Sequence, residues 1–349
     1  MSRLFKCMKL LQLILFSLLI VVTTCSQTKR SVHPAFYYWR TTFHLSAAET
    51  NYLQAMGAKK LYVKFFDVDW DSTRMLPVPK GALSFNTYPP KDLEIIPTVF
   101  ITNRTLLNSP EGAIRSLSHN ILKKLKAQRE HLKNPVREIQ FDCDWTLKTR
   151  AKYFALLGIL RKSLKDSGIH ISATIRLHQI KYYKRTGVPP VDRGMLMFYN
   201  MGDLRDLSTR NSILDIETAK KYLVNFKDYP LRLDVALPIF SWAVLIRDNR
   251  IIRLINNVRE KDLADNHFKK LDSHRYQVLK SHYFFKGYLY KNDVLRLETV
   301  PLDRIRQSAI MLSKIIKNEY INIAFYHLDE EIIKHYDSKD LKNICRYFD

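Results

Sequence analysis

Polar and apolar residues alternate along residues 138–146, where acidic or amide side chains at every second position are separated by apolar ones. A period of two is typical of a β-strand with one polar face. Acids on such a face need a space filled by water or ligand in front of them, because an unpaired carboxylate is costly to bury. The end of a parallel barrel provides that space. An edge strand with its acids in solvent is the simpler alternative.

Helical patterns separate this strand from others. The remaining strand candidates are residues 35–40, 60–66, 94–101, 170–177, 195–200, 233–240 and 321–327, with the fourth strand at 138–144. Ser46 and Glu49 form a capping-box sequence, and apolar residues recur at helical spacing over 114–125 and 153–164. Eight strands that alternate with helices predict an α/β fold, a (β/α)8 TIM barrel.

Two intervals are too long to be simple connections. Residues 68–91 contain four prolines and predict an irregular loop on the rim after strand two. Residues 244–300 predict a subdomain inserted between strands seven and eight, with a hairpin around Asp248 and Asn249. The predicted barrel domain therefore covers residues 33–349, with an insertion at about 244–300.

The first 25 residues are of another kind. Three basic residues precede an apolar run over 10–22, which is too short for a bilayer span of about 20 residues and matches the core of a signal peptide. Cys25 follows in a sequence that resembles a bacterial lipobox, although Thr24 stands where that motif has glycine, alanine or serine. We therefore expect an exported cell-envelope protein that is anchored to the membrane through lipid on Cys25, with a tether over 26–32. Plain secretion is the alternative.

The remaining composition narrows the chemistry. Cys143 and Cys345 are the other cysteines beyond the leader, and their number and spacing predict neither a disulfide framework nor a zinc site. No phosphate-binding loop or dinucleotide fingerprint is present, and we expect no cofactor. The histidines show no metal-ligand spacing either, and we expect no metal. The formal charge is +23, and without the three basic leader residues 54 basic and 34 acidic residues give +20. This excess favours an anionic polysaccharide or lipid head groups over nucleic acid, for which no binding motif is present; general surface basicity is the alternative.

Two short motifs resemble those of glycoside hydrolase family 18, the chitinase-like barrels. Asp142, Asp144 and the residues around them are similar to the family's fourth-strand Asp-x-Asp-x-Glu, and residues 197–200 are similar to its sixth-strand Met-x-Tyr-Asp. Both occur in order on the predicted strands four and six. The resemblance implies a barrel that acts on a polysaccharide, with Asp142 and Asp144 as catalytic acids and Tyr199 as a substrate-binding residue. The insertion before strand eight also resembles the extra subdomain of many such barrels.

The departures from that family change the expected chemistry. Thr146 stands where the family has the glutamate that protonates the leaving oxygen, and a threonine hydroxyl does not supply that proton at neutral pH. Asn200 stands where the family has a further aspartate. Two outcomes follow: either another carboxylate has taken over acid catalysis, or the cleft binds a glycan without cutting it.

Candidates for a replacement acid lie at the ends of two other strands. Asp67 and Asp69 close strand two, and Asp329 and Glu330 close strand eight. Most glycosidases use two carboxyl groups about 5 to 10 Å apart, which opposing barrel strands provide. For Asp329 and Glu330, a role as helix caps or surface acids is the alternative.

Strand five places Arg176 and His178 on one face, from which Arg176 could hold an aspartate ionised and His178 could contact a sugar hydroxyl or a phosphate. A purely structural histidine is the alternative. Four tryptophans at strand ends predict stacking platforms for sugars, with core filling as the alternative for each: Trp39, Trp70, Trp145 and Trp242.

The favoured interpretation is an exported glycoside hydrolase-like barrel that acts on a polysaccharide. The alternative is a non-catalytic, glycan-binding cell-envelope lipoprotein. A phosphodiesterase-type barrel is the third interpretation, because such barrels use histidines or acids and His33, His178 and His327 fall near strands one, five and eight. Their spacing is not typical of metal ligands, which counts against it.

Overall fold

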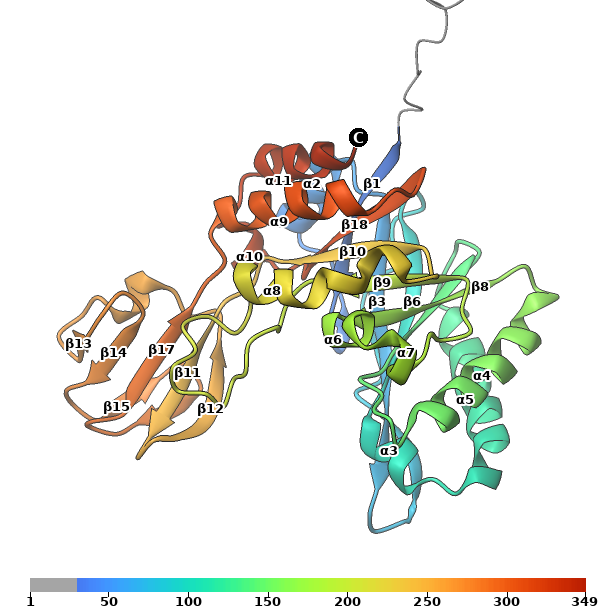
Figure 1. The fold of residues 1–349 in the computed structure, drawn as a ribbon, viewed down its shortest axis with the longest axis horizontal. Helices are drawn as coiled ribbons and strands as arrows, with labels where there is room; N and C mark the ends of the chain where they lie inside the picture. The colour runs from blue at the N-terminus through green and yellow to red at the C-terminus, as the bar shows by residue number, and fades with distance from the viewer. Residues whose placement is uncertain (1–29) are drawn as a thin grey trace, which may run out of the picture.

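The eight parallel strands of the barrel come from the whole length of the chain. The computed structural model describes residues 30–349. The barrel strands are β1 (Ser31–Tyr38), β3 (Lys60–Asp71), β6 (Glu94–Ile101), β7 (Glu138–Asp142), β8 (His170–Arg176), β9 (Arg193–Met197), β10 (Leu233–Pro238) and β18 (Tyr320–Tyr326). Strand β1 pairs with β18 on one side and with β3 on the other, which closes the barrel. The predicted (β/α)8 fold is confirmed (Figure 1).

The alternation along β7 decides which side chains enter the barrel. Its polar residues point inward, where the Tyr37 hydroxyl donates to Gln140 Oε1 at 2.6 Å and the Ser172 hydroxyl donates to Glu138 Oε1 at 2.6 Å. Ile139 and the other apolar residues of the strand are fully buried on the opposite side. The barrel interior is thus a hydrogen-bonded polar stack, as buried polar groups require.

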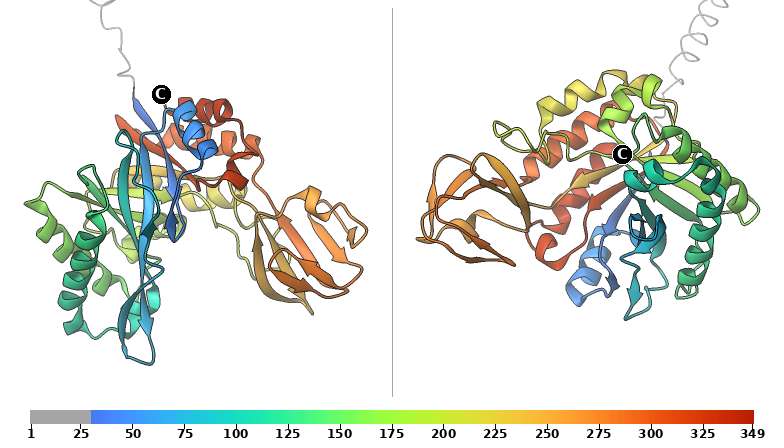
Figure 2. Two further views of the ribbon diagram at one scale, coloured as in Figure 1. Left: turned by 180° about the vertical axis from the view of Figure 1, so that it is seen from behind. Right: turned by 90° about the horizontal axis from the view of Figure 1, so that it is seen from below.

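Helices surround the strands, as the view along the barrel shows (Figure 2). They are α2 (Ala47–Met56), α3 (Asn103–Asn108), α4 (Ile114–Arg129), α5 (Arg150–Lys165), α6 (Leu177–Lys181), α7 (Tyr183–Thr186), α8 (Ile216–Tyr222), α9 (Leu302–Ile315), α10 (Glu330–Ile333) and α11 (Ser338–Cys345). The predicted capping box of α2 is present, with the Ser46 side chain accepting from the Glu49 N–H. Gly57 ends this helix at φ 67°, a left-handed conformation that glycine adopts without strain.

The segment after strand two differs from the prediction. Strand β3 continues to Asp71 and pairs antiparallel with β4 (Leu76–Lys80), so residues 68–80 form a β-hairpin where the sequence had predicted an irregular loop. Pro77 and Pro79 are tolerated because β4 is the edge strand, where a missing N–H breaks no second ladder. The short strands β2 (Thr42–Phe43) and β5 (Ser84–Phe85) then pair with each other.

A separate antiparallel sheet is inserted between β10 and β18, where the sequence predicted a subdomain (Figure 1). Its strands are β11 (Trp242–Arg247), β12 (Arg250–Asn256), β13 (Phe268–Lys270), β14 (Arg275–Val278) and β17 (Val294–Glu298), accompanied by the hairpin of β15 (His282–Phe284) and β16 (Gly287–Leu289). The turn between β11 and β12 uses Asp248 and Asn249 at φ 47° and 58°, both residue types that tolerate this conformation. The sheet has its own apolar core, which includes Leu245, Tyr276 and Leu295.

A buried ion pair attaches this sheet to the barrel. Arg296 and Glu298 are both fully buried, and the Arg296 Nε donates to Glu298 Oε1 at 2.8 Å. The other carboxylate oxygen of Glu298 accepts from the Ser212 N–H and hydroxyl, at 2.8 and 2.6 Å, and from the Trp242 Nε1 at 2.9 Å. Ser212 lies in the connection between β9 and α8, so one carboxylate joins the inserted sheet to a barrel loop.

The predicted leader, its lipidation site Cys25 and most of the tether lie outside the described residues. Within residues 30–349, none of the helices is long and apolar enough to cross a membrane.

Candidate functional site

Two adjoining cavities open at the carboxyl ends of the barrel strands. The mouth cavity has a volume of about 440 Å³ and is lined by Trp39, Phe100, Asp142, Arg176, Met197, Tyr199, Asn200, Phe240, Ser241, Trp242, Asn256, Asn257, Tyr326, His327 and Asp329. The side cavity has a volume of about 370 Å³ and is lined by Asp144, Trp145, Thr146, Arg176, Leu177, His178, Tyr199, Met201, Tyr222 and again Asn200. Arg176, Tyr199 and Asn200 belong to both walls.

Asp142 is the last residue of β7 and lies in the wall of the mouth cavity. Its side chain points into the barrel and accepts a short hydrogen bond from the Thr174 hydroxyl of β8. Burial raises the pKa of Asp142 to about 6; Arg176 lowers it, and the negative charge of Asp144 raises it further. A carboxyl group with this pKa is partly protonated near pH 6 and can either donate or accept a proton there.

Asp144 lies beyond the end of β7 and faces the side cavity. Arg176, at the end of β8, donates from Nε to Asp144 Oδ1 at 2.5 Å and from Nη2 to Oδ2 at 3.3 Å. Arg176 therefore is the partner of an aspartate, as predicted, and the contact between them is bidentate. The two aspartates are divided between the cavities, with Arg176 between them.

Tyr199 follows β9 and contributes to both cavities. Its ring lies 5.3 Å from that of Tyr326 and 5.8 Å from that of Phe240, measured between centroids. The Arg176 guanidinium lies 5.9 Å from the centroid of the same ring. Asn200 is exposed at φ 53°, and its N–H donates to the Ile213 carbonyl at 2.8 Å. Tyr199 therefore forms part of an aromatic wall, and Asn200 supplies an amide at the rim.

Thr146 and His178 both lie in the side cavity, near Asp144. The sequence had predicted strand five over residues 170–177, with His178 on the same face as Arg176. The chain turns into α6 after Arg176, so His178 leaves the strand face and lies on the helix. Partial burial lowers the pKa of His178, and Arg176 lowers it further against the opposing effect of Asp144. His178 is therefore neutral at pH 7 and can both donate and accept a hydrogen bond.

The four tryptophans separate into two groups. Trp39 and Trp242 are partly exposed in the mouth cavity, where a sugar ring can reach them. Trp145 is only 1% exposed: its ring stacks on Tyr153 and its Nε1 donates to the Thr186 carbonyl at 3.0 Å. Trp145 therefore borders the side cavity but leaves no open ring face for a sugar, and its contacts fit the alternative of core filling rather than a platform.

Trp70 also lies away from the site. It is buried and lines an apolar cavity between the β3–β4 hairpin and α4, to which Leu117 and the exposed Met75 also contribute, and it lines neither the mouth nor the side cavity. The prediction of a sugar platform is wrong here as well, because β3 continues past the barrel end into the hairpin and places Trp70 in the wall of this other cavity.

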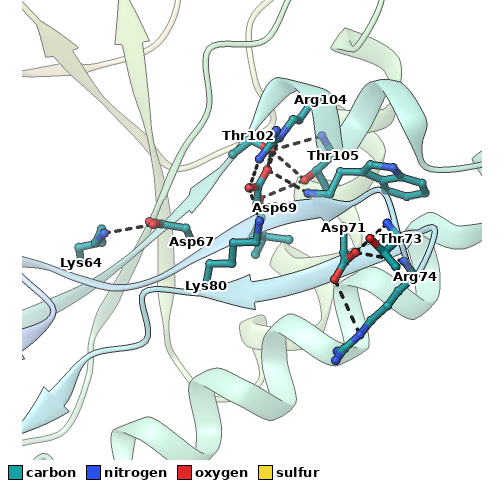
Figure 3. A network of polar contacts seen from close by, with 12 residues as sticks. Lys64, Asp67, Asp69, Asp71, Thr73, Arg74, Lys80, Thr102, Arg104 and Thr105 are labelled. Atoms are coloured by element: carbon teal, nitrogen blue, oxygen red, sulfur yellow. Dashed lines mark hydrogen bonds and ion pairs between the residues drawn. The ribbon is translucent and has the colours of Figure 1, made fainter. Parts of the chain in front are cut away.

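Asp69 is held in an ion-pair cluster that excludes it as a free acid (Figure 3). Arg104 donates to it from Nε and Nη2, Lys80 from Nζ at 3.0 Å and Thr102 from its hydroxyl at 2.9 Å. The hydrogen bonds from Arg104 hold the pKa of Asp69 well below its usual range. Asp69 therefore joins the β3–β4 hairpin to α3, and the prediction of a catalytic role for it is contradicted.

Asp67 lies on the same strand but has other contacts (Figure 3). Its Oδ2 accepts from Lys64 Nζ at 3.1 Å, whereas its buried Oδ1 has no hydrogen-bond partner among residues 30–349. The charge of Asp67 contributes to the raised pKa of Asp142, so the two carboxyl groups lie near one another. Asp67 lines neither the mouth nor the side cavity, so the structure does not bring it together with Asp144 in one wall.

The acids after strand eight have mainly structural contacts. Asp329 lines the mouth cavity, but its Oδ2 accepts from Arg40 at 3.0 Å and its Oδ1 caps α10 by accepting from the Glu331 N–H. Glu330 is exposed in the first turn of that helix and lines neither cavity, so its predicted place in the cleft is wrong.

Several wall residues of the mouth cavity were not predicted. Tyr326 ends β18 on the same inward face as Asn322, which the period-two rule would have identified. Asn256 ends β12 and Asn257 follows it, and both bring amides from the inserted sheet. His327 had been considered only as a metal ligand. Burial lowers its pKa to about 4, and its Nδ1 has no hydrogen-bond partner in the described part of the chain.

Within residues 30–349 no three histidine, cysteine, aspartate or glutamate side chains are grouped closely enough to hold a metal ion.

No family model matches the sequence, and no curated protein matches it either. Solved structures of low identity are nevertheless similar. The spore cortex-lytic enzyme SleL of Bacillus megaterium QM B1551 is 14% identical with a TM-score of 0.55, covering 92% of this chain and 75% of its own. The GH18 chitinase ChiB from the chitin utilization locus of Flavobacterium johnsoniae is 11% identical with a TM-score of 0.55, covering 91% and 94%. The chitinase-like agglutinin of Robinia pseudoacacia is 11% identical with a TM-score of 0.53, covering 90% and 99%. The chain therefore has a glycoside hydrolase-like TIM-barrel fold.

Proposed function

We propose that the protein binds a glycan chain in the mouth and side cavities. The observation that supports this proposal is the mouth cavity itself, whose wall combines the aromatic residues Trp39, Trp242 and Tyr326 with Asp142. Aromatic faces pack against the C–H faces of a sugar, and convergent polar groups fix its hydroxyls. The similar structures include enzymes of glycan degradation and an agglutinin, which supports the same class of ligand.

Binding without cleavage is the form of this function that the contacts support best. Thr146 lies in the side cavity beside Asp144, at the position where family 18 enzymes have their proton-donating glutamate. Asp144 forms an ion pair with Arg176. Asp329 forms an ion pair with Arg40 and caps the start of α10. None of these three residues is a free general acid, which is what cleavage of a glycosidic bond requires.

Hydrolysis is the second candidate, and the raised pKa of Asp142 favours it. At about 6, this pKa leaves the carboxyl group partly protonated at the pH where many general acids work. In this form of the function Asp142 would donate the proton, and the Arg176-paired Asp144 would stabilise positive charge on the sugar ring.

Calorimetric titration with chitin-derived and peptidoglycan-derived oligosaccharides, followed by mass spectrometry of the same mixtures, tests both forms. We expect saturable binding of one oligosaccharide class and no shortened product. Trp39→Ala should weaken this binding, whereas Tyr88→Ala, which removes an exposed tyrosine outside both cavities, should leave it unchanged. Products that disappear in Asp142→Asn would establish hydrolysis instead. If no glycan binds, both forms are wrong.

We also propose that the protein is exported and held at the cell envelope by lipid on Cys25, as the apolar run before that residue suggests. The charge of +20 beyond the leader favours an anionic glycan as the ligand. In that case binding should weaken as salt shortens the screening length below about 8 Å, and a salt-insensitive affinity for a neutral oligosaccharide would assign recognition to the aromatic walls alone.

A further inference from the structure

Three tyrosines line one face of the β15–β16 hairpin in the inserted sheet. Tyr283 lies directly opposite Tyr288 in the strand register, and Tyr290 follows two residues later on the same face. Their side chains are 82%, 40% and 52% exposed, respectively. The opposite face of the hairpin carries Phe284 and Leu289, which are buried in the core of the inserted sheet. The hairpin therefore presents a continuous aromatic face, which we call the tyrosine face, to solvent.

The tyrosine face is organised before any ligand arrives. The ring centroids of Tyr283 and Tyr288 are 5.0 Å apart, and those of Tyr288 and Tyr290 are 5.1 Å apart, each pair in an edge-to-face arrangement. The Arg247 guanidinium lies 4.3 Å from the centroid of the Tyr290 ring. Arg247 is itself fixed by Asp293, to which it donates from Nε and Nη2 at 2.7 and 2.8 Å. Rings that are already ordered lose little conformational entropy on binding.

The charged residues of the hairpin segment itself are all basic, and the nearby Asp293 is paired with Arg247. Residues 279–291 contain Lys280, Lys286 and Lys291 and no acidic residue. None of the residues of this segment lines the mouth or the side cavity. A partner that fits the exposed tyrosine rings has flat apolar faces of similar size and carries hydroxyls. A partner that fits the lysines carries negative charge.

We infer that the tyrosine face is a second contact surface for the glycan, and that it binds a polysaccharide chain carrying carboxylates at a place separate from the barrel cavities. This inference rests on the proposed glycan-binding function and extends it from a short oligosaccharide to a polymer. Pyranose rings pack on the tyrosines, while the phenol hydroxyls and the lysines bind sugar hydroxyls and carboxylates.

A lipid surface fits the same face less well. Insertion of this face into hydrocarbon would take the phenol hydroxyls out of water without giving them hydrogen-bond partners, which is unfavourable. A polysaccharide leaves each hydroxyl a hydrogen-bonding partner. A polymer that occupies both the cavities and the tyrosine face also gains affinity from the linkage of its two contacts.

The test uses the full chain with Tyr283→Ala and Tyr288→Ala combined in one double variant. Its binding to a long and to a short ligand is compared with that of the unmodified protein. The long ligand is purified peptidoglycan sacculi, whose strands carry carboxylates, and the short ligand is a tetrasaccharide of the same sugars. We expect binding to sacculi in co-sedimentation to weaken by about tenfold or more, with the tetrasaccharide affinity unchanged. Tyr88→Ala is the matched control: Tyr88 is 60% exposed and outside the inserted sheet, and its removal should change neither ligand.

Equal binding of sacculi by the double variant and the unmodified protein would overturn the inference. So would a loss of binding to vesicles of phosphatidylglycerol with sacculus binding retained, since the tyrosine face would then be a membrane contact. If the double variant misfolds, as judged by circular dichroism, Lys286→Glu on the turn replaces it. This variant reverses a charge beside the tyrosine face, and it should likewise weaken binding to sacculi and leave the tetrasaccharide affinity unchanged. If the tetrasaccharide does not bind even the unmodified protein, the proposed glycan site in the barrel is wrong. The inference about the tyrosine face is still tested, because sacculus binding by the double variant is measured separately.

Discussion

Arg176 binds both carboxylate oxygens of Asp144, and this ion pair separates the two cavities at the barrel mouth. The same guanidinium lowers the pKa of Asp142, which burial raises. Arg176 therefore interacts with both aspartates: Asp144, which is exposed in the side cavity, and Asp142, which is buried in the wall of the mouth cavity.

Replacement of Arg176 by glutamine should raise the pKa of Asp142 above its value of about 6. The reason is that the positive charge that favours ionised Asp142 is lost, while Asp144 continues to disfavour it. A carbon-13 NMR titration of the aspartate carboxyl groups measures the shift. Arg115→Gln, which removes an exposed charge from α4, is the control and should leave the titration unchanged. An unchanged or lower pKa in Arg176→Gln would contradict the assignment.

Asp142→Asn should stabilise the protein at neutral pH. The folded-state pKa of about 6 lies above the ordinary value of 3.8, so folding disfavours the ionised form, and stability falls as the pH rises from about 4 to 6. Asparagine has no charge to bury and still accepts from Thr174. The free energy of unfolding should therefore rise by about 2–3 kcal/mol above pH 6.5 and change little below pH 4. Urea denaturation at pH 4 and pH 7.5 measures this, and a pH-independent effect would refute it.

Two tryptophan substitutions should have opposite consequences. Trp145→Ala removes a ring that is 1% exposed, so we expect about 3–5 kcal/mol of destabilisation with glycan affinity retained in the folded fraction. Trp242→Ala should weaken glycan binding with a smaller loss of stability, because Glu298 keeps both donors from Ser212. Chemical denaturation and calorimetric titration of both variants distinguish these outcomes. Loss of affinity in Trp145→Ala without loss of stability would restore it as a sugar platform.

Glu298→Ala should destabilise the connection between the barrel and the inserted sheet. Removing one partner of a buried pair leaves Arg296 charged and unpaired, at a cost of about 3–5 kcal/mol. Hydrogen exchange of the Ser212 amide should rise as well, because that N–H loses its acceptor. Glu217→Ala on the exposed face of α8 is the control. A change in exchange without a change in unfolding free energy would mean that the pair positions the loop only.

Cys25→Ser tests the anchor. If lipid is attached at Cys25, the serine variant should leave the membrane fraction or accumulate with its leader uncleaved. Cell fractionation and intact-mass measurement of both proteins provide the readout, with Cys345→Ser as the control for loss of a thiol elsewhere. The same mass and the same membrane fraction for variant and unmodified protein would rule out the anchor.

The barrel fold could be predicted from the sequence because the patterns that indicate its strands and helices are local and recur along the chain. The alternation in β7 placed Glu138 and Gln140 inside the barrel, and the capping box at Ser46 and the turn at Asp248 fixed element ends. The prediction that Arg176 could hold an aspartate ionised followed from neighbouring parallel strands, whose ends meet at one edge; that the partner is Asp144 and the contact bidentate comes from the structure.

The errors concern where side chains point after a strand ends. Trp145 and His178 follow strands that stop two and one residues earlier than predicted, so the period of two no longer applies to them. Trp70 and Asp69 belong to a strand that continues further than predicted and leaves the barrel. These ends depend on tertiary contacts, such as the pairing of β3 with β4, which a single sequence does not display.

The pairing of the first strand with the last determines when a binding site can exist at all. Trp39 follows β1 and Tyr326 ends β18, and their rings meet at 5.9 Å in the wall of the mouth cavity. These contacts have almost the greatest sequence separation that the chain allows, and such contacts form slowly. A nascent or shortened chain without β18 therefore has no mouth cavity, and the recovery of glycan affinity during refolding reports the moment at which the barrel closes.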